Sequence, residues 1–362
     1  MYTLYGAEVS YFTGKARAYL DWADLPYEER LATRDVYKDV IVPRVGWPVI
    51  PVLIGPDEEV LQDTSDIIDA LEARHLGLSV YPCDPAQRLA ALLFELLGDE
   101  WLVIPAMHYR WRYNRDFAYR EFGKISAPAA TPEEQFEIGK ANAVNFEGAL
   151  PVLGVDDATG PAIEAAYLKL LKQLDAHFAE HLMLLGDRPS IGDFGLMGPL
   201  YAHQYRDPAS GKIMKTEAPN VARWVERMRK PEPQSGEFLP DDEVPVTLLP
   251  ILSDQFRDQF PVLASTAAAL AEWAADKSPG EPVPRALGPH GFKIGDTQTD
   301  GNRMIFPFNL WMLQRPLDHY RGLEGDEKTA ADRLLDACGG DALRAFPDFP
   351  RLERRNFKLV LA

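Results

Sequence analysis

The sequence is poor in cysteine, and this scarcity limits the kinds of site it can hold. Only Cys83 and Cys338 occur in 362 residues, far apart, and neither belongs to a Cys-x-x-Cys or a Cys/His cluster. A disulfide framework needs many more cysteines, and a structural zinc site needs clustered ligands. We therefore expect no disulfide framework, no metal, and a reducing, cytoplasmic location.

Basic charge and long apolar runs are also scarce. The chain has 38 Lys and Arg against 55 Asp and Glu, a formal net charge of −17. Nonspecific nucleic-acid binding depends on clustered Lys and Arg, so we expect no nucleic-acid partner. The longest apolar stretches, at residues 89–97 and 264–275, are shorter than the roughly 20 residues of a membrane helix. We therefore expect no membrane partner.

The first 75 residues contain the clearest secondary-structure pattern. Short apolar segments bounded by turn residues predict four strands, at residues 2–5, 27–31, 49–54 and 60–62. Helical spacing predicts two helices, at residues 12–23 and 65–74, and residues 40–48 are predicted to form a loop. The order strand, helix, strand, strand, strand, helix predicts a small α/β sandwich with a mixed sheet.

From residue 85 the apolar spacing becomes helical and predicts an all-α domain. The predicted helices are at residues 89–97, 101–111, 136–150, 163–185, 194–205 and 221–228. Residues 113–132 show no clean period, so we expect a loop or a broken helix there. Ser190 and Asp193 fit a capping box that opens one of the helices.

The remainder of the chain predicts a mixed region. Residues 230–243 are rich in proline and acidic residues, which predicts a linker. Residues 248–275 predict a helix broken or kinked at Pro250 and Pro261, and residues 291–294 and 304–306 predict a β-hairpin. A last strand is expected within residues 351–361. Residues 303–315 are so apolar and aromatic that we expect them to be buried.

Three short segments near the start of the chain fit one active-site plan. Ser10 precedes the first predicted helix, Ile50-Pro51 opens a predicted strand, and Asp63-Thr64 precedes the next helix. In order and spacing they resemble the glutathione S-transferase family. The resemblance implies a thioredoxin-like glutathione-binding domain at residues 1–76 and an all-α substrate-pocket domain at residues 84–230. Residues 240–362 are then an additional extension, expected to pack on the helical domain.

The resemblance also implies roles for these residues. Ser10, with Tyr5 as a second hydroxyl, is expected to stabilise the thiolate of glutathione, the co-substrate. Ile50-Pro51, if joined by a cis bond, presents backbone groups to the cysteinyl unit, and Asp63-Thr64 holds a carboxylate. Each feature also has a purely structural interpretation, as helix caps, a packed tyrosine and an ordinary proline at a strand start.

The electrophile is expected to bind between the two domains. Residues 107–113 offer an amphipathic wall in which Tyr109 and Arg112 are the candidate pocket residues, with Arg110 as an alternative ligand for an anion. The competing interpretation is that half of these residues are ordinary helix core.

The sequence thus predicts a glutathione transferase that adds the thiol to an electrophilic small molecule, and the family implies a homodimer. Because no cysteine lies near Ser10, thiol–disulfide exchange is disfavoured. Tyr11 stands where many relatives have proline. The alternatives are a noncatalytic binding protein on the transferase fold and a glutathione-dependent isomerase or peroxidase. The His-x-x-Glu-His sequence from His177 to His181 resembles a zinc motif, but no third ligand is evident, and we expect no metal there.

Overall fold

The computed structural model describes residues 1–75 and 77–362. Its N-terminal part is a four-stranded sheet in the order β2-β1-β3-β4. The strands are β1 (Tyr2–Gly6), β2 (Tyr27–Leu31), β3 (Val52–Ile54) and β4 (Val60–Gln62). β1 runs parallel to β2 and antiparallel to β3, and β3 runs antiparallel to β4. The predicted thioredoxin-like α/β unit with a mixed sheet is confirmed.

Alternate residues of the strands face two different layers. Leu4 and Leu53 pack with α1 (Tyr11–Trp22) and α4 (Thr64–Glu72), while Tyr5 and Val52 pack in a second cluster. That second cluster includes the short helical segments α2 (Arg34–Val36), η1 (Tyr37–Ile41) and α3 (Val42–Val45). The loop predicted at residues 40–48 is therefore wrong as far as Val45. Ile41 and Val45 are spaced one helical turn apart and are both buried, and this burial stabilises the helical conformation.

The next part of the chain is all-α, as predicted. Its helices are α5 (Pro85–Glu100), α6 (Val103–Tyr113), α9 (Gly160–Glu180), α10 (Ile191–Pro199), η3 (Leu200–Tyr205), α11 (Pro208–Glu217) and α12 (Pro219–Arg229). α5 and α10 cross closely, since a Cβ added to Gly98 would lie 2.4 Å from the carbonyl oxygen of Gly195. The capping box of Ser190 and Asp193 is present at the start of α10.

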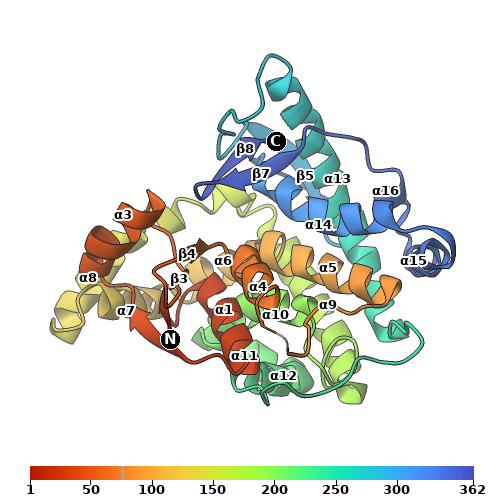
Figure 1. The fold of residues 1–362 in the computed structure, drawn as a ribbon. Helices are drawn as coiled ribbons and strands as arrows, with labels where there is room; N and C mark the ends of the chain where they lie inside the picture. The colour runs from red at the N-terminus through yellow and green to blue at the C-terminus, as the bar shows by residue number, and fades with distance from the viewer. Residues whose placement is uncertain (76) are drawn as a thin grey trace.

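A helical hairpin projects from this domain at the left of Figure 1. It consists of α7 (Arg115–Ser126) and α8 (Pro132–Glu147), with η2 (Pro151–Leu153) after it. Residues 113–132 were predicted to be a loop or a broken helix. The loop is wrong, and the broken helix is closer, because α7 is separated from α6 at Asn114 and from α8 by residues 127–131. The two helices approach through glycines, because a Cβ on Gly123 would lie 1.8 Å from the Gln135 carbonyl oxygen. A contact made through missing side chains gives little apolar periodicity to detect.

The C-terminal extension occupies the top and the upper right of Figure 1. Its elements are η4 (Val246–Leu248), α13 (Leu249–Ala274), β5 (Pro289–Ile294), β6 (Thr299–Met304), α14 (Phe308–Gly322), α15 (Gly325–Cys338), α16 (Asp341–Arg344), β7 (Leu352–Arg355) and β8 (Lys358–Leu361). The hairpin predicted around residues 291–306 is confirmed. α13 continues through Pro261, and the single strand predicted at residues 351–361 is a hairpin that turns at Asn356 and Phe357, both with positive φ.

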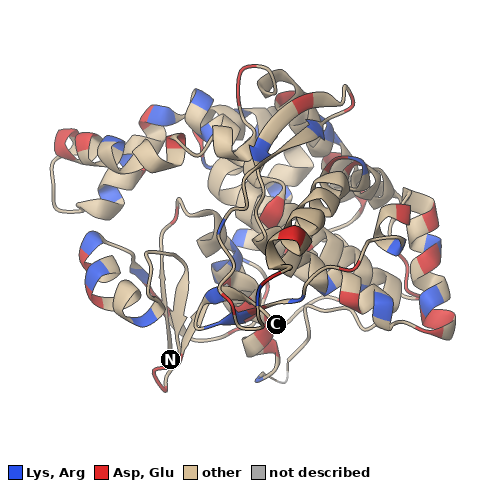
Figure 2. Ribbon diagram, turned by 90° about the horizontal axis from the view of Figure 1, so that it is seen from above, with Lys and Arg blue, Asp and Glu red and all other residues tan. Residues whose placement is uncertain are grey.

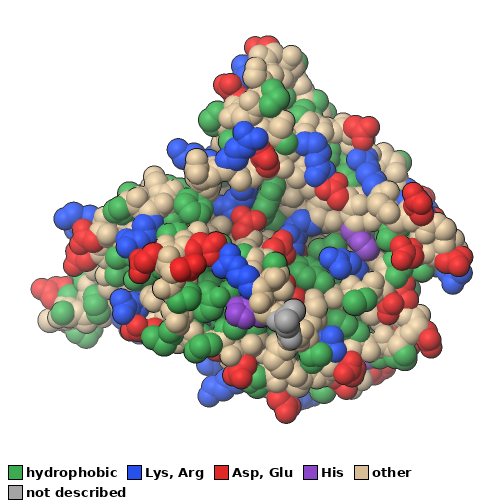
Figure 3. Space-filling view, in the orientation of Figure 1, with side chains coloured by type: hydrophobic (Ala, Val, Ile, Leu, Met, Phe, Trp, Pro, Cys, Tyr) green, Lys and Arg blue, Asp and Glu red, His purple; other side chains and the backbone are tan. Residues whose placement is uncertain are grey.

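The extension packs on both preceding parts of the chain. Leu310, Met312 and Leu313 of α14 are buried, which confirms the burial expected of residues 303–315. α14 lies against α5 of the helical domain, and Phe357 packs with the second cluster of the sheet. Among the described residues no helix combines the length and apolar composition needed to span a bilayer. Acidic and basic side chains are interspersed over the helices and over the face in view (Figures 2 and 3).

Candidate active site

One edge of the N-terminal sheet gathers the three predicted segments. Tyr5 of β1 pairs with Val52 of β3, and Val52 pairs with Gln62 of β4. Because β3 is antiparallel to both neighbours, the end of β1, the start of β3 and the end of β4 lie at the same edge. The segments that follow β1, precede β3 and follow β4 therefore come together there.

Ser10 is the N-cap of α1. Its backbone is extended, and its Oγ accepts a hydrogen bond from the Thr13 N–H at 3.3 Å. The side chain is half-buried, and in residues 1–75 and 77–362 its hydroxyl hydrogen has no protein acceptor. The hydroxyl can therefore cap the helix as an acceptor and still donate its hydrogen to a nearby anion.

A buried arginine fixes the turn before Ser10. Arg110 of α6 donates from Nη1 to the carbonyl oxygen of Val9 at 3.0 Å, and it pairs with Asp207 through Nε and Nη2 at 2.8 Å each. Arg110 was an alternative candidate for binding an anionic substrate. The structure instead uses its N–H groups to hold the protein backbone next to Ser10.

The other two segments have unusual backbone conformations at the same edge. The Ile50-Pro51 bond is cis. Asp63 has a φ of 76°, and its carboxylate caps α4 by accepting from the Ser65 N–H at 2.9 Å. The next residue, Thr64, is buried at the first position of α4. The start of this helix thus offers N–H groups that suit a carboxylate ligand.

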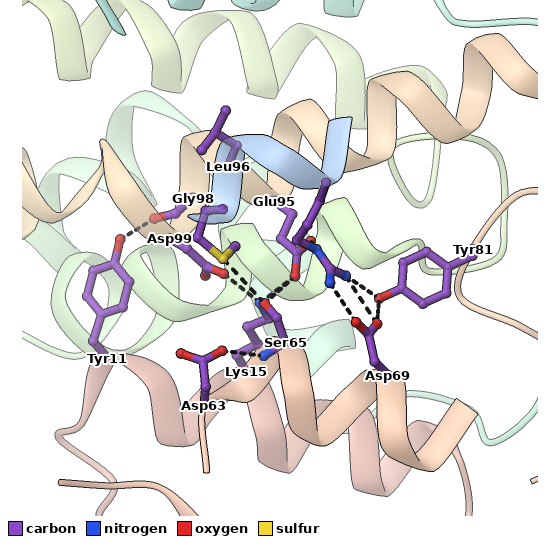
Figure 4. Close-up of polar contacts among 12 residues, drawn as sticks. Tyr11, Lys15, Asp63, Ser65, Asp69, Tyr81, Glu95, Leu96, Gly98 and Asp99 are labelled. Carbon is purple, nitrogen blue, oxygen red and sulfur yellow. Dashed lines mark hydrogen bonds and ion pairs between the residues drawn. The ribbon is translucent and has the colours of Figure 1, made fainter. Parts of the chain in front are cut away.

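A buried ionic cluster lies next to Asp63 and Ser65 at the start of α4 (Figure 4). Lys15 Nζ contacts Glu95 Oε1 at 2.8 Å, Asp99 Oδ2 at 2.6 Å and Ser65 Oγ at 3.1 Å. Burial alone would lower the pKa of Lys15, but the two carboxylates raise it above its ordinary value. Burial raises the pKa of Asp99, although Lys15 opposes that rise. The cluster joins α1, α4 and α5 through charge rather than through apolar contact.

Tyr11 connects the start of α1 to the end of α5. Its hydroxyl donates to the carbonyl oxygen of Gly98, and its ring packs edge-on against His203. Burial raises the pKa of Tyr11 well above its ordinary value, so the hydroxyl stays protonated. The residue that departs from the family pattern therefore fixes the helix that carries Ser10.

Comparison with family models identifies both domains. Residues 4–78 match the model described as "Glutathione S-transferase, N-terminal domain", and residues 157–227 match "Glutathione S-transferase, C-terminal domain". The chain thus contains the N- and C-terminal domains of the glutathione S-transferase family, over these two ranges. A search of curated proteins gives no match.

The solved structures matched to this chain include two glutathione S-transferases and a β-etherase, at low sequence identity and with TM-scores below 0.5. A glutathione S-transferase from Rhodospirillum rubrum F11 is 17% identical with a TM-score of 0.42, and the match covers 68% of this chain and 96% of that one. The β-etherase LigF from Sphingobium sp. strain SYK-6 is 16% identical with a TM-score of 0.46, and the match covers 63% of this chain and 94% of that one. A Methylobacterium radiotolerans glutathione S-transferase in complex with glutathione sulfonate is 22% identical with a TM-score of 0.39, and the match covers 67% of this chain and 99% of that one.

The remaining predicted residues of this transferase-family chain lie elsewhere. Tyr5 is buried in the second cluster of the sheet, where its ring has a packing role. Arg112 is an exposed partner of Asp157 at 2.7 Å. Tyr109 is buried beside the ring of Tyr167, with ring centroids 5.3 Å apart. Among residues 1–75 and 77–362, none of these three side chains hydrogen-bonds to Ser10.

The zinc-like sequence at residues 177–181 has a structural explanation. His177 is buried, its Nδ1 lies 2.8 Å from Thr247 Oγ1, and its Nε2 lies 3.1 Å from the Met183 carbonyl oxygen. Burial lowers the pKa of His177 to about 4. Both ring nitrogens therefore have protein partners.

Sequence analysis missed the arginines that the extension places at the site. Arg354 of β7 donates to the Gln62 carbonyl oxygen at 2.7 Å and also contacts the side chains of Gln62 and Asp66. Burial and Asp63 raise the pKa of Asp66 to about 6, although Arg354 opposes them. Arg315 of α14 donates to Glu95 at 2.9 Å and to Asp69 at 2.6 Å. No local pattern signals such contacts, because the partners are far apart in sequence.

Proposed function

We propose that this chain is a glutathione transferase that activates the glutathione thiol for addition to an electrophilic small molecule. The observation that carries the proposal is the convergence of Ser10, Ile50-Pro51 and Asp63-Thr64 at one sheet edge where two helices begin. The thiolate is the reactive form of a thiol, and a helix start provides N–H groups and partial positive charge that stabilise an anion.

Each segment has a role in this proposal. The Ser10 hydroxyl donates to the glutathione sulfur, and the start of α4 at Asp63-Thr64 receives a glutathione carboxylate. Backbone groups of Ile50 pair with the cysteinyl unit. Arg110 supports the reaction indirectly, because it holds the Val9 carbonyl and so the position of Ser10.

The chemistry follows from the residue at the start of α1. The thiol proton leaves to solvent, and the sulfur forms a bond to an electrophilic carbon. In a substitution the carbon's leaving group departs with its bonding electrons. In an addition to a double bond the displaced electron pair takes up a proton from solvent. Serine cannot form the mixed disulfide that thiol exchange requires, so addition is favoured over exchange.

The family resemblance also implies a homodimer in the cytoplasm. Light scattering of the purified protein would test the dimer.

Ultraviolet absorbance of the bound thiolate tests the proposal without knowledge of the electrophile. Glutathione bound to the wild type should ionise at a lower pH than free glutathione. Ser10→Ala should move that midpoint upward by about one pH unit, the worth of one hydrogen bond to a charged group. Ser278→Ala, which removes an exposed hydroxyl of the extension, is the matched control and should leave the midpoint unchanged.

Two results would contradict the proposal. The first is a folded wild type that does not bind glutathione in calorimetry, which would favour the noncatalytic alternative. The second is an identical ionisation midpoint in the wild type and Ser10→Ala, which would remove Ser10 from the chemistry.

A further inference from the structure

Arg303 of β6 is a buried arginine without hydrogen-bond partners for most of its guanidinium. The residue is only 3% exposed, and within residues 1–75 and 77–362 neither Nε nor Nη1 has a partner. Its guanidinium carbon lies 5.6 Å from the Trp101 ring centroid and 5.8 Å from that of Phe306. The aromatic rings attract the charge but accept no N–H hydrogen bond comparable to that of an oxyanion.

Among residues 1–75 and 77–362, no side chain forms an ion pair with Arg303. Burial and the nearby Asp99 and Asp63 raise the pKa of Glu100 to about 8, although Arg303 opposes them, so this carboxyl is mostly protonated near neutral pH. His290 pairs with Arg303 across the hairpin, and burial together with Arg303 lowers its pKa to about 4. Arg303 is therefore a net positive charge in a neutral setting, which is costly unless an anion joins it.

The end of α5 connects this arginine to the candidate active site. Gly98 accepts from the Tyr11 hydroxyl beside Ser10, and Asp99 pairs with Lys15 of α1. The next two residues are Glu100 and Trp101, which face Arg303. Consecutive residues of one helix end thus contact the first turns of α1 on one side and the extension on the other.

The hairpin that carries Arg303 is held firmly in place. Asp258 of α13 accepts from the Gly295 N–H at 3.0 Å and from Gln298 Nε2 at 2.9 Å at the hairpin turn. The Phe292 ring packs so closely that a Cβ on Gly301 would lie 2.5 Å from it. The fold therefore pre-positions an unpaired guanidinium, as a binding site for an anion requires.

We propose that Arg303 binds the carboxylate of the second substrate, and that this substrate is an aromatic or similarly flat carboxylate. Since Trp101 and Phe306 lie beside the guanidinium, its N–H edge is what remains for an oxyanion, and the partly exposed Phe306 ring offers a surface for a flat body. This inference rests on the proposed function for the reaction, but the binding of a carboxylate does not depend on glutathione.

Benzoate and its neutral analogue benzamide are the probes that test this site. Tryptophan fluorescence of the full chain should report benzoate binding at least about 10-fold tighter than benzamide, the usual worth of a charge-assisted hydrogen bond. Arg303→Met should abolish this preference, and Arg303→Lys should retain part of it. Arg285→Met removes an exposed arginine of the same extension and should leave benzoate binding unchanged.

Thermal stability shows whether Arg303 has a structural role instead of a binding role. Glutathione binding shows whether a failure concerns Arg303 or the proposed function. Without ligand, Arg303→Met should melt at or above the wild-type temperature, because an unpaired buried charge is removed. A clear loss of stability or of folding, no benzoate preference in the wild type, or equal benzoate affinity in both proteins would each overturn the proposal. If S-methylglutathione fails to bind while benzoate binding depends on Arg303, only the proposed function fails.

Discussion

Arg110 and Asp207 form a buried, two-pronged ion pair whose third contact reaches the residue before Ser10. The Nε–Oδ2 and Nη2–Oδ1 distances are both 2.8 Å, and Nη1 holds the Val9 carbonyl oxygen at 3.0 Å. A planar guanidinium presents several N–H groups in a fixed geometry, which lysine cannot reproduce. The pair therefore links the helical domain to the turn that positions the candidate catalytic hydroxyl.

Arg110→Met should impair both stability and thiol activation. It leaves Asp207 buried without its counter-ion, a loss of about 3–5 kcal/mol in the free energy of unfolding, and it frees the Val9 carbonyl. Urea unfolding and the ionisation midpoint of bound glutathione measure the two effects. Arg112→Met is the matched control, since it removes an exposed arginine of the same helix. Similar values for both variants would contradict this assignment.

Lys15→Met should destabilise the junction of α1, α4 and α5. Glu95 and Asp99 would then face one another in the core without their shared cation, which costs about 3–5 kcal/mol in unfolding free energy. The double variant Lys15→Met/Asp99→Asn should recover part of that loss, because it removes the repulsion between the two carboxylates. Denaturant unfolding of the wild type, Lys15→Met, Asp99→Asn and the double variant gives the comparison, and strictly additive losses would argue against the coupling.

Asp193→Ala should affect folding rather than chemistry. Asp193 is fully buried and completes the capping box with Ser190, and its Oδ1 also accepts from the Leu184 N–H at 3.0 Å and from Trp224 Nε1 at 3.2 Å. Loss of the cap and of these bonds should cost about 2–4 kcal/mol. Asp326→Ala, in the exposed first turn of α15, is the control. Intact stability with lost glutathione turnover in Asp193→Ala would disprove the structural assignment.

Glu100→Gln should stabilise the protein at alkaline pH. Because the folded-state pKa is raised to about 8, the folded chain binds this proton more tightly than the unfolded chain. Stability is therefore highest below the ordinary pKa and declines as pH rises toward about 8. The melting temperature of Glu100→Gln should match the wild type near pH 5 and exceed it near pH 9. An equal difference at both pH values would show that Glu100 does not titrate in this way.

The early part of the fold was predictable because its signals are local. A short apolar segment at residues 2–5, bounded by Gly6, identifies β1, and helical spacing in residues 12–23 identifies α1. The Ser190-x-x-Asp193 pattern identifies the start of α10. The helix predicted at residues 136–150 corresponds to α8, but α7 was not predicted as a regular helix. The two helices meet through Gly123 and Gly139, whose lack of side chains leaves no apolar stripe. A periodic sequence pattern reveals helices that pack through apolar side chains. It does not reveal helices whose backbones approach closely at glycines.

By itself the sequence determined the order of the elements, the family resemblance, and the placement of Ser10, Ile50-Pro51 and Asp63-Thr64 next to helix and strand ends. Only the tertiary structure decided that Arg110 holds the backbone rather than a substrate. It also decided that Arg354 reaches Asp66, 288 residues away in sequence, and that Arg303 stands unpaired beside Trp101. The physical reason is that an arginine's role depends on which acceptors surround it, and those acceptors come from segments that only the folded chain brings together.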